Sequence, residues 1–156
     1  MKADDLRNLQ APLKQKYRDE PNAAVITLHA EGRTGEGVTC SVETGRALVK
    51  AGLHPASGGP PINACSGDML LQALVACAGV TLNAVATSLG LAVEEATVRA
   101  EGDLDFRGTL GVDKQAPVGF REIRLVFNVK GNLTPDQLKK LIELTERYCV
   151  VYQTLR

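Results

Sequence analysis

The sequence has no net charge, no Cys-x-x-Cys pair, no internal repeat and no low-complexity segment. Its 18 basic residues balance its 18 acidic residues. The two kinds are interspersed, so there is no strong field to attract nucleic acid or an anionic membrane. Residues 1–6 lack the apolar core of a signal peptide. We therefore expect a cytoplasmic protein that binds neither nucleic acid nor membranes.

The length of 156 residues is sufficient for one domain with a substantial core. We predict a single domain over residues 1–156. Its first 22 residues are expected to form a helical extension, interrupted by Pro12. This prediction depends on apolar residues at helical spacing: Leu6, Leu9, Leu13 and Tyr17.

The stretch from Asp68 to Leu89 has no charged side chain after its first residue. Apolar and small residues occupy every side of its helical wheel, which predicts a helix buried all round. Ser66 is the expected N-cap, and Gly90 is the expected end. The helix is long enough to cross a membrane, but several polar residues disfavour that interpretation: Gln72, Thr81, Asn83, Thr87 and Ser88.

Alternating and β-branched segments predict the strands. A glycine-rich turn is expected between the first two of them, over residues 31–37. Loops are expected over residues 52–63 and 108–119. The predicted strands cover residues 23–30, 38–43, 96–107 and 120–130, and residues 46–50 are a candidate for a short additional strand.

A second helix is predicted to begin at Thr134, where a capping threonine precedes Pro135 and Gln137. Its apolar face carries Cys149 inward at its end. Two strands and a helix, followed by two strands and a helix, predict an α+β fold with a mostly antiparallel sheet.

Four cysteines in a cytoplasmic chain are more typical of reduced, catalytic or metal-binding thiols than of a disulfide framework. A free cysteine on an apolar helix is most often a packing residue, and Cys40 in a strand fits that interpretation. Cys77 and Cys149 both lie on inward helix faces. A metal site built from Cys65, His54 and Cys149 lacks the usual ligand spacing.

Two segments resemble the OsmC/Ohr family of organic hydroperoxide reductases: the run from Cys65 to Cys77, and the run from Glu146 to Leu155. The family pattern has an acidic residue, Leu-Leu, small residues and a cysteine on a long helix. A second cysteine ends the next helix, often before proline, and Thr-Leu follows. The resemblance implies an OsmC-like fold, in which a long central buried helix and a second helix pack with an antiparallel sheet in an intertwined homodimer.

The resemblance also implies residue roles. Cys77 matches the peroxidatic cysteine and Cys149 the resolving cysteine. Arg33 matches the activating arginine, with Arg46 as the alternative, and Asp68 is the candidate carboxylate that orients it. No cofactor and no metal are implied. The implied partners are a second copy of the chain, an organic hydroperoxide, and an external thiol or dithiol reductant.

Physical chemistry sets a condition on Cys77, because a peroxidatic thiol needs a lowered pKa. Its own helix N-terminus is about ten residues away, too far to act, and burial raises a thiol pKa. We therefore expect an arginine from another element or subunit to supply the charge. Cys65 would lie about 18 Å from Cys77 if the helix began there, too far for a disulfide.

A second hypothesis keeps the same fold without turnover. Gly67 stands where the peroxidase members of the family have glutamate. This difference favours a non-catalytic homodimer that binds a small molecule or senses redox state.

Overall fold

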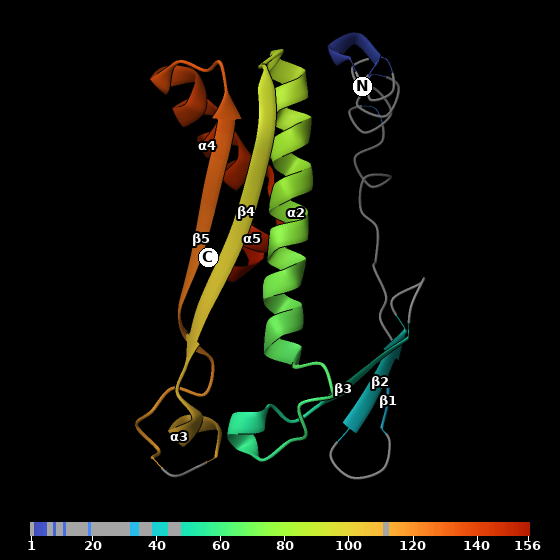
Figure 1. Ribbon diagram of the computed structural model, residues 1–156, viewed down its shortest axis with the longest axis vertical. Helices are drawn as coiled ribbons and strands as arrows, with labels where there is room; N and C mark the ends of the chain where they lie inside the picture. Colours follow the sequence, from blue (N-terminus) through green and yellow to red (C-terminus); the bar gives the residue numbers. More distant parts are fainter. Residues whose placement is uncertain are drawn as a thin grey trace. The chain divides into compact units, whose positions relative to one another are not determined.

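The computed structural model describes residues 2–5, 8, 11, 19, 32–34, 39–43, 48–110 and 113–156 (Figure 1). They group into two compact units. One contains Val75–Val98 and Phe127–Arg156, and the other contains His29–Leu74 and Arg99–Val126. The single domain stays a prediction. The helical extension over 1–22 lies largely outside the described residues, and the strand over 23–30 lies wholly outside them.

The long helix α2 covers Ser66–Leu89. The carbonyl of Cys65 accepts the first helical hydrogen bond, from the N–H of Met69 at 3.0 Å. The N-cap is the residue whose carbonyl accepts that bond. Cys65 therefore occupies the N-cap position, and the assignment of Ser66 as the cap is wrong by one residue.

The end of α2 is as predicted. Gly90 adopts a left-handed backbone with φ of 65°. The N–H of Leu91 donates to the carbonyl of Ala86 at 2.9 Å, and the N–H of Gly90 donates to the carbonyl of Thr87 at 3.1 Å. This pair of bonds is a Schellman motif, which satisfies carbonyls that the helix end would otherwise leave free.

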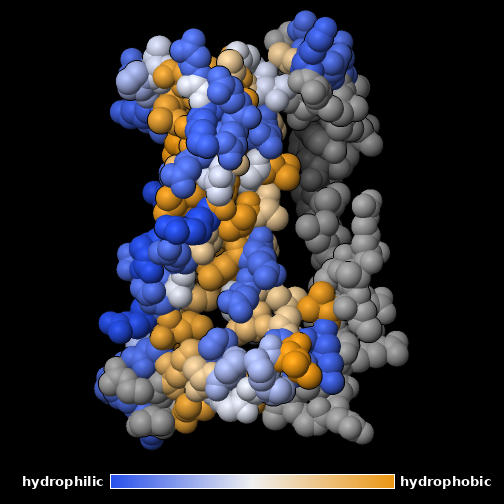
Figure 2. Space-filling view, in the orientation of Figure 1, coloured by the Kyte–Doolittle hydropathy of each residue, from blue (hydrophilic) through white to orange (hydrophobic). Residues whose placement is uncertain are grey.

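One face of α2 is open, so the prediction of a helix buried all round is wrong for the single chain. Val80 is 71% exposed, and Figure 2 shows apolar surface along this helix. A helical wheel shows which faces of a helix are apolar, but it does not show which of them another element covers. Here the exposed face and the covered face are both apolar. The helix also meets the length and apolarity of a membrane span, a test that core helices of soluble proteins pass. The open face is marked by five of the exposed residues of α2, which recur every three or four positions: Leu70, Ala73, Ala76, Val80 and Asn83.

The opposite face of α2 builds the core of the first unit. Leu82, Val85 and Ala86 of α2 contact Leu141 of α4 (Pro135–Tyr148), which is fully buried. Side chains from both long strands and from α4 pack against this cluster. They are Val93, Phe127, Val129, Ile142 and Leu144.

Strands β4 (Val93–Leu104) and β5 (Phe120–Gly131) form a two-stranded sheet. Lys130 pairs with Glu95 at 2.6 Å, and Arg124 contacts Glu101 at 3.4 Å. From one pair to the other, the number rises by six on one strand and falls by six on its neighbour, so the strands run antiparallel (Figure 1). Both predicted long strands are confirmed.

The predicted strand over 96–107 is too long at its end. Phe106 begins a short helix, α3 (Phe106–Thr109), inside what was expected to be strand and loop. The ring of Phe106 stacks on the ring of His54, with the two centroids 5.1 Å apart. His54 also caps the 3-10 helix η2 (Pro55–Ser57), because its Nδ1 accepts the N–H of Ala56 at 3.0 Å.

A separate three-stranded antiparallel sheet has the order β1 (Gly32–Thr34), β2 (Thr39–Glu43), β3 (Leu48–Gly52). The strands predicted over 38–43 and 46–50 are confirmed as β2 and β3, with shifted ends. The turn predicted over 31–37 is wrong for residues 32–34, which form β1, and the rest of it lies outside the described residues. Three residues can pair through backbone bonds alone, without the alternating side chains that mark a longer strand. The α+β class with antiparallel sheets is confirmed.

Candidate functional site

Helix α4 places Cys149 in the core. The expected capping box is present: the Thr134 hydroxyl accepts the N–H of Gln137 at 3.2 Å, and the Gln137 side chain accepts the N–H of Thr134 at 2.9 Å. Leu141, Thr145 and Cys149 follow at intervals of four, and none is more than 1% exposed. The cap fixes where the helix begins, and the apolar spacing then turns Cys149 inward.

The chain breaks its helix at Cys149, whose φ of −74° and ψ of 107° are extended. A further helix, α5 (Val150–Leu155), begins at the next residue. Helix α5 was not predicted. Members of the family often have proline after the second cysteine, and a proline there would have indicated a helix start, since proline favours the first position of a helix. Val150 occupies that position here.

The structure brings Cys77 and Cys149 together as free thiols. The Cys149 side chain hydrogen-bonds the Cys77 sulfur. The backbone N–H groups of Val150 and Val151 also donate toward that sulfur. These two groups lie in the first turn of α5, where a helix has no carbonyls of its own to accept them.

The environment favours the thiolate of Cys77. Burial raises the pKa of the Cys77 thiol, but the hydrogen bonds from Val151, Cys149 and Val150 together outweigh it, so the net shift is downward. Thr81, one turn further along α2, adds a smaller lowering effect on this pKa. Its hydroxyl also donates to the Cys77 carbonyl at 2.8 Å.

This result corrects the expectation that only an arginine could lower the pKa of Cys77. The N-terminus of α2 is indeed remote, but the N-terminus of α5 is adjacent. Backbone N–H groups carry no side-chain signature, so residue types alone gave no sign of them. Thr81 was also not predicted as a site residue; the signal that could have found it is its spacing, four residues after Cys77 on the same helix.

Cys149 has the opposite character. Burial raises the pKa of the Cys149 thiol and the neighbouring Cys77 sulfur raises it further, whereas hydrogen bonds from the backbone of Tyr152 and Val151 lower it in part. The thiolate therefore forms more readily at Cys77 than at Cys149. A thiolate is the nucleophilic form of cysteine, so the shifts favour Cys77 over Cys149 as a nucleophile.

The other candidate residues belong to other elements or lie outside the described residues. Arg33 is in β1, where its backbone pairs with Ser41, and Arg46 lies outside the described residues. Asp68 is exposed in the first turn of α2, nine residues and roughly 13 Å of helix before Cys77. Cys65 precedes that turn, as expected for a cysteine that does not bridge Cys77.

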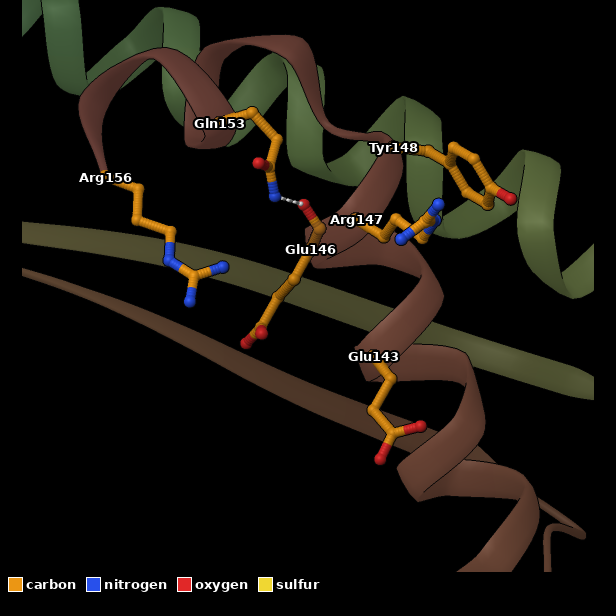
Figure 3. A pocket seen from close by; sticks show the side chains of 6 residues that line it. All are labelled: Glu143, Glu146, Arg147, Tyr148, Gln153 and Arg156. Carbon is orange, nitrogen blue, oxygen red and sulfur yellow. Dashed lines mark hydrogen bonds between the residues drawn. The ribbon is translucent and has the colours of Figure 1, made fainter.

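A polar pocket of about 440 Å³ lies where α4 and α5 meet (Figure 3). The Arg147 guanidinium lies over the Tyr148 ring, 5.8 Å from its centroid. Across the described ranges, no three His, Cys, Asp or Glu side chains gather so that they could hold a metal ion. The pocket is lined by Glu143, Glu146, Arg147, Tyr148, Gln153 and Arg156.

Comparison with known proteins places this site in context. A family model described as OsmC-like protein matches residues 59–156. That range includes Cys77 and Cys149. No curated protein matches the sequence.

Solved structures share the fold at low identity. An OsmC-like protein from Mycoplasma pneumoniae is 18% identical with a TM-score of 0.68, over 83% of this chain and 87% of that one. An organic hydroperoxide resistance protein from Elizabethkingia anophelis is 21% identical with a TM-score of 0.68, over 85% and 90%. The organic hydroperoxide resistance protein OhrB of Bacillus subtilis is 19% identical with a TM-score of 0.59, over 85% of this chain and 93% of that one.

Proposed function

Because the chain belongs to the OsmC-like protein family, we propose that it is a thiol-dependent peroxidase that reduces organic hydroperoxides in oxidative-stress defence. The observation that carries the proposal is the contact between Cys77 and Cys149, with their pKa values shifted in opposite directions. The similar proteins from Elizabethkingia anophelis and Bacillus subtilis are named for organic hydroperoxide resistance, which supports the same chemistry.

The reaction uses the two thiols in sequence. The Cys77 thiolate attacks the terminal oxygen of R–O–O–H, a sulfur–oxygen bond forms, and the oxygen–oxygen bond breaks. The alkoxide takes a proton and leaves as alcohol, and Cys77 becomes a sulfenic acid. The Cys149 thiol then condenses with it, so that a disulfide forms and water leaves. An external thiol or dithiol reduces the disulfide and restores both cysteines.

Arg33 is proposed to bind the peroxide oxygens through its forked guanidinium, with Arg46 as the alternative. Asp68 is proposed to orient that arginine. The α5 N–H groups already favour the thiolate. The arginine's proposed role is therefore to hold the substrate and to stabilise the charge that leaves with the alkoxide.

The proposed assembly is a cytoplasmic homodimer. Its support is the exposed apolar stripe of α2, which includes Leu70 and Val80. Exposed apolar surface on a soluble protein marks a contact surface when it is continuous. Val80 lies one turn from Cys77, so a partner packed on this stripe would border the thiol pair.

The direct test mixes reduced protein with cumene hydroperoxide or hydrogen peroxide in stopped flow. We expect Cys77 to be oxidised far faster by cumene hydroperoxide than free cysteine is, and peptide mapping to find a Cys77–Cys149 disulfide. Cys149→Ser should stop at the sulfenic acid, which dimedone traps. Cys65→Ser is the control and should retain full turnover. Oxidation of Cys77 no faster than that of free cysteine would refute the peroxidase.

One observation favours a non-catalytic binding or redox-sensing homodimer as the second candidate. Gly67 occupies the position of the family glutamate and has no side chain to orient an arginine. Its neighbours are apolar, with Phe120 and Leu104 within 3.7 Å of the Cβ position it lacks. In that case the stopped-flow experiment would give slow oxidation, without a repeated catalytic cycle when reductant is added.

A further inference from the structure

The helix break at Cys149 removes one helical hydrogen bond and leaves its donor and its acceptor free for other partners. In an uninterrupted helix, the N–H of Val150 would donate to the carbonyl of Glu146, four residues earlier. The extended backbone of Cys149 prevents that bond. The N–H of Val150 is thereby freed for the Cys77 sulfur, and the carbonyl of Glu146 is left without its helical donor.

Gln153 supplies the missing donor. Its side-chain Nε2 donates to the carbonyl of Glu146 at 2.9 Å (Figure 3). The bond reaches back seven residues and ties the first full turn of α5 to the last turn of α4. Within α5 itself, the Gln153 N–H donates to the carbonyl of Cys149 at 3.0 Å. Gln153 therefore connects α5 both to α4, at Glu146, and to the break residue, Cys149.

We propose that Gln153 is a positioning residue: its bond to the Glu146 carbonyl fixes the direction of α5 and so holds the N–H groups of Val150 and Val151 toward the Cys77 sulfur. A helix as short as Val150–Leu155 has little stability of its own. Its start is fixed by the covalent chain at Cys149. A second attachment one turn later is needed to fix its axis.

This inference rests on the proposed role of Cys77 as the reacting thiol. Its test, however, reads the thiol without any peroxide. The reduced protein is alkylated with iodoacetamide across the neutral and alkaline pH range, and peptide mass spectrometry follows Cys77 alone. Gln153→Met keeps the length of the side chain and removes the donor. Gln153→Ala removes the whole side chain and suits a helix.

Both variants should shift the alkylation profile of Cys77 to higher pH. They should also lower its rate of reaction with iodoacetamide at neutral pH by about three- to tenfold, the effect of weakened hydrogen bonds to a charged group. The matched control is Thr154→Val. The Thr154 hydroxyl bonds the carbonyl of Val150 at 2.9 Å, inside α5, so the control leaves the connection to α4 intact and should keep the wild-type profile.

An unchanged profile in the two Gln153 variants would overturn the proposal, as would an equal shift in Thr154→Val. Loss of folding would also count against it, because an exposed side chain required for folding has a general stabilising role. Failure of the proposed peroxidase is separate. It would appear as slow oxidation by cumene hydroperoxide in the wild type, whatever the alkylation profiles show.

Discussion

The Cys149 thiol donates its hydrogen bond to Cys77, and the two pKa values move apart. Cys77 has its charged form stabilised by donors from α5, whereas Cys149 is 1% exposed and burial disfavours its charged form. At Cys77 the hydrogen bonds together outweigh burial, whereas at Cys149 burial and the neighbouring sulfur outweigh the hydrogen bonds from Tyr152 and Val151.

The first prediction concerns pH. The thiolate is the reactive form and the pKa of Cys77 is lowered, so its reactivity should rise with pH and level off at a lower pH than for free cysteine. Cys149 has a raised pKa, so its alkylation should begin at higher pH than for free cysteine. Residue-resolved alkylation profiles check both. Coincident profiles for the two cysteines would contradict the assigned asymmetry.

The second prediction concerns the donor at Val150. Val150→Pro removes its N–H, and Cys149 already has the extended backbone that a residue before proline requires. The first position of a helix also tolerates proline. Losing one bond to a charged group should raise the pKa of Cys77 by about one unit.

The control for Val150→Pro is Val150→Ala, which shortens the side chain and keeps the N–H. Thiolate absorbance, measured on both variants as reduced proteins, provides the comparison. We expect the alanine variant to titrate like the wild type. A shift of similar size in both variants would attribute the effect to side-chain packing and not to the donor.

The long elements were predictable because their patterns repeat. Helix α2, strands β4 and β5 and helix α4 each extend over three or more turns or ten or more residues, so apolar periodicity and caps identified them. The short elements β1, α3 and α5 were missed, since each covers fewer than two periods of its own pattern, too few for a repeat to be recognised. The resemblance to a known family, and not the spacing, identified Cys77 and Cys149 as a pair.

The features that periodicity could not supply were those that depend on neighbours. An apolar wheel did not distinguish the covered side of α2, with Leu82 at 1% exposure, from the open side, with Val80 at 71%. The donors to Cys77 are backbone groups released by a one-residue break, and every residue except proline has such a group. Only the geometry at Cys149 identifies which ones are free.

The third prediction compares two glycines near Phe120. A Cβ added at Gly67 would lie 3.5 Å from the Phe120 ring, an ordinary contact, whereas one added at Gly102 would lie 2.5 Å from it. Gly67→Ala should therefore stabilise the fold by about 0.5 kcal/mol, through reduced freedom of the unfolded chain. Gly102→Ala should destabilise it by about 1–3 kcal/mol, through overpacking. Urea denaturation of the two variants checks both signs, and stabilisation by Gly102→Ala would contradict the close packing of Phe120.

The last prediction tests the homodimer through the open face of α2. Val80→Glu would place a charge on the exposed stripe, and burying an unpaired charge in an interface is costly. We expect the wild type to be dimeric and this variant to be monomeric by light scattering after size exclusion. Val118→Glu is the matched control, since Val118 is a valine of similar exposure, 65%, in the loop between α3 and β5. The control should remain dimeric. A dimeric Val80→Glu protein would exclude this stripe as the contact between subunits.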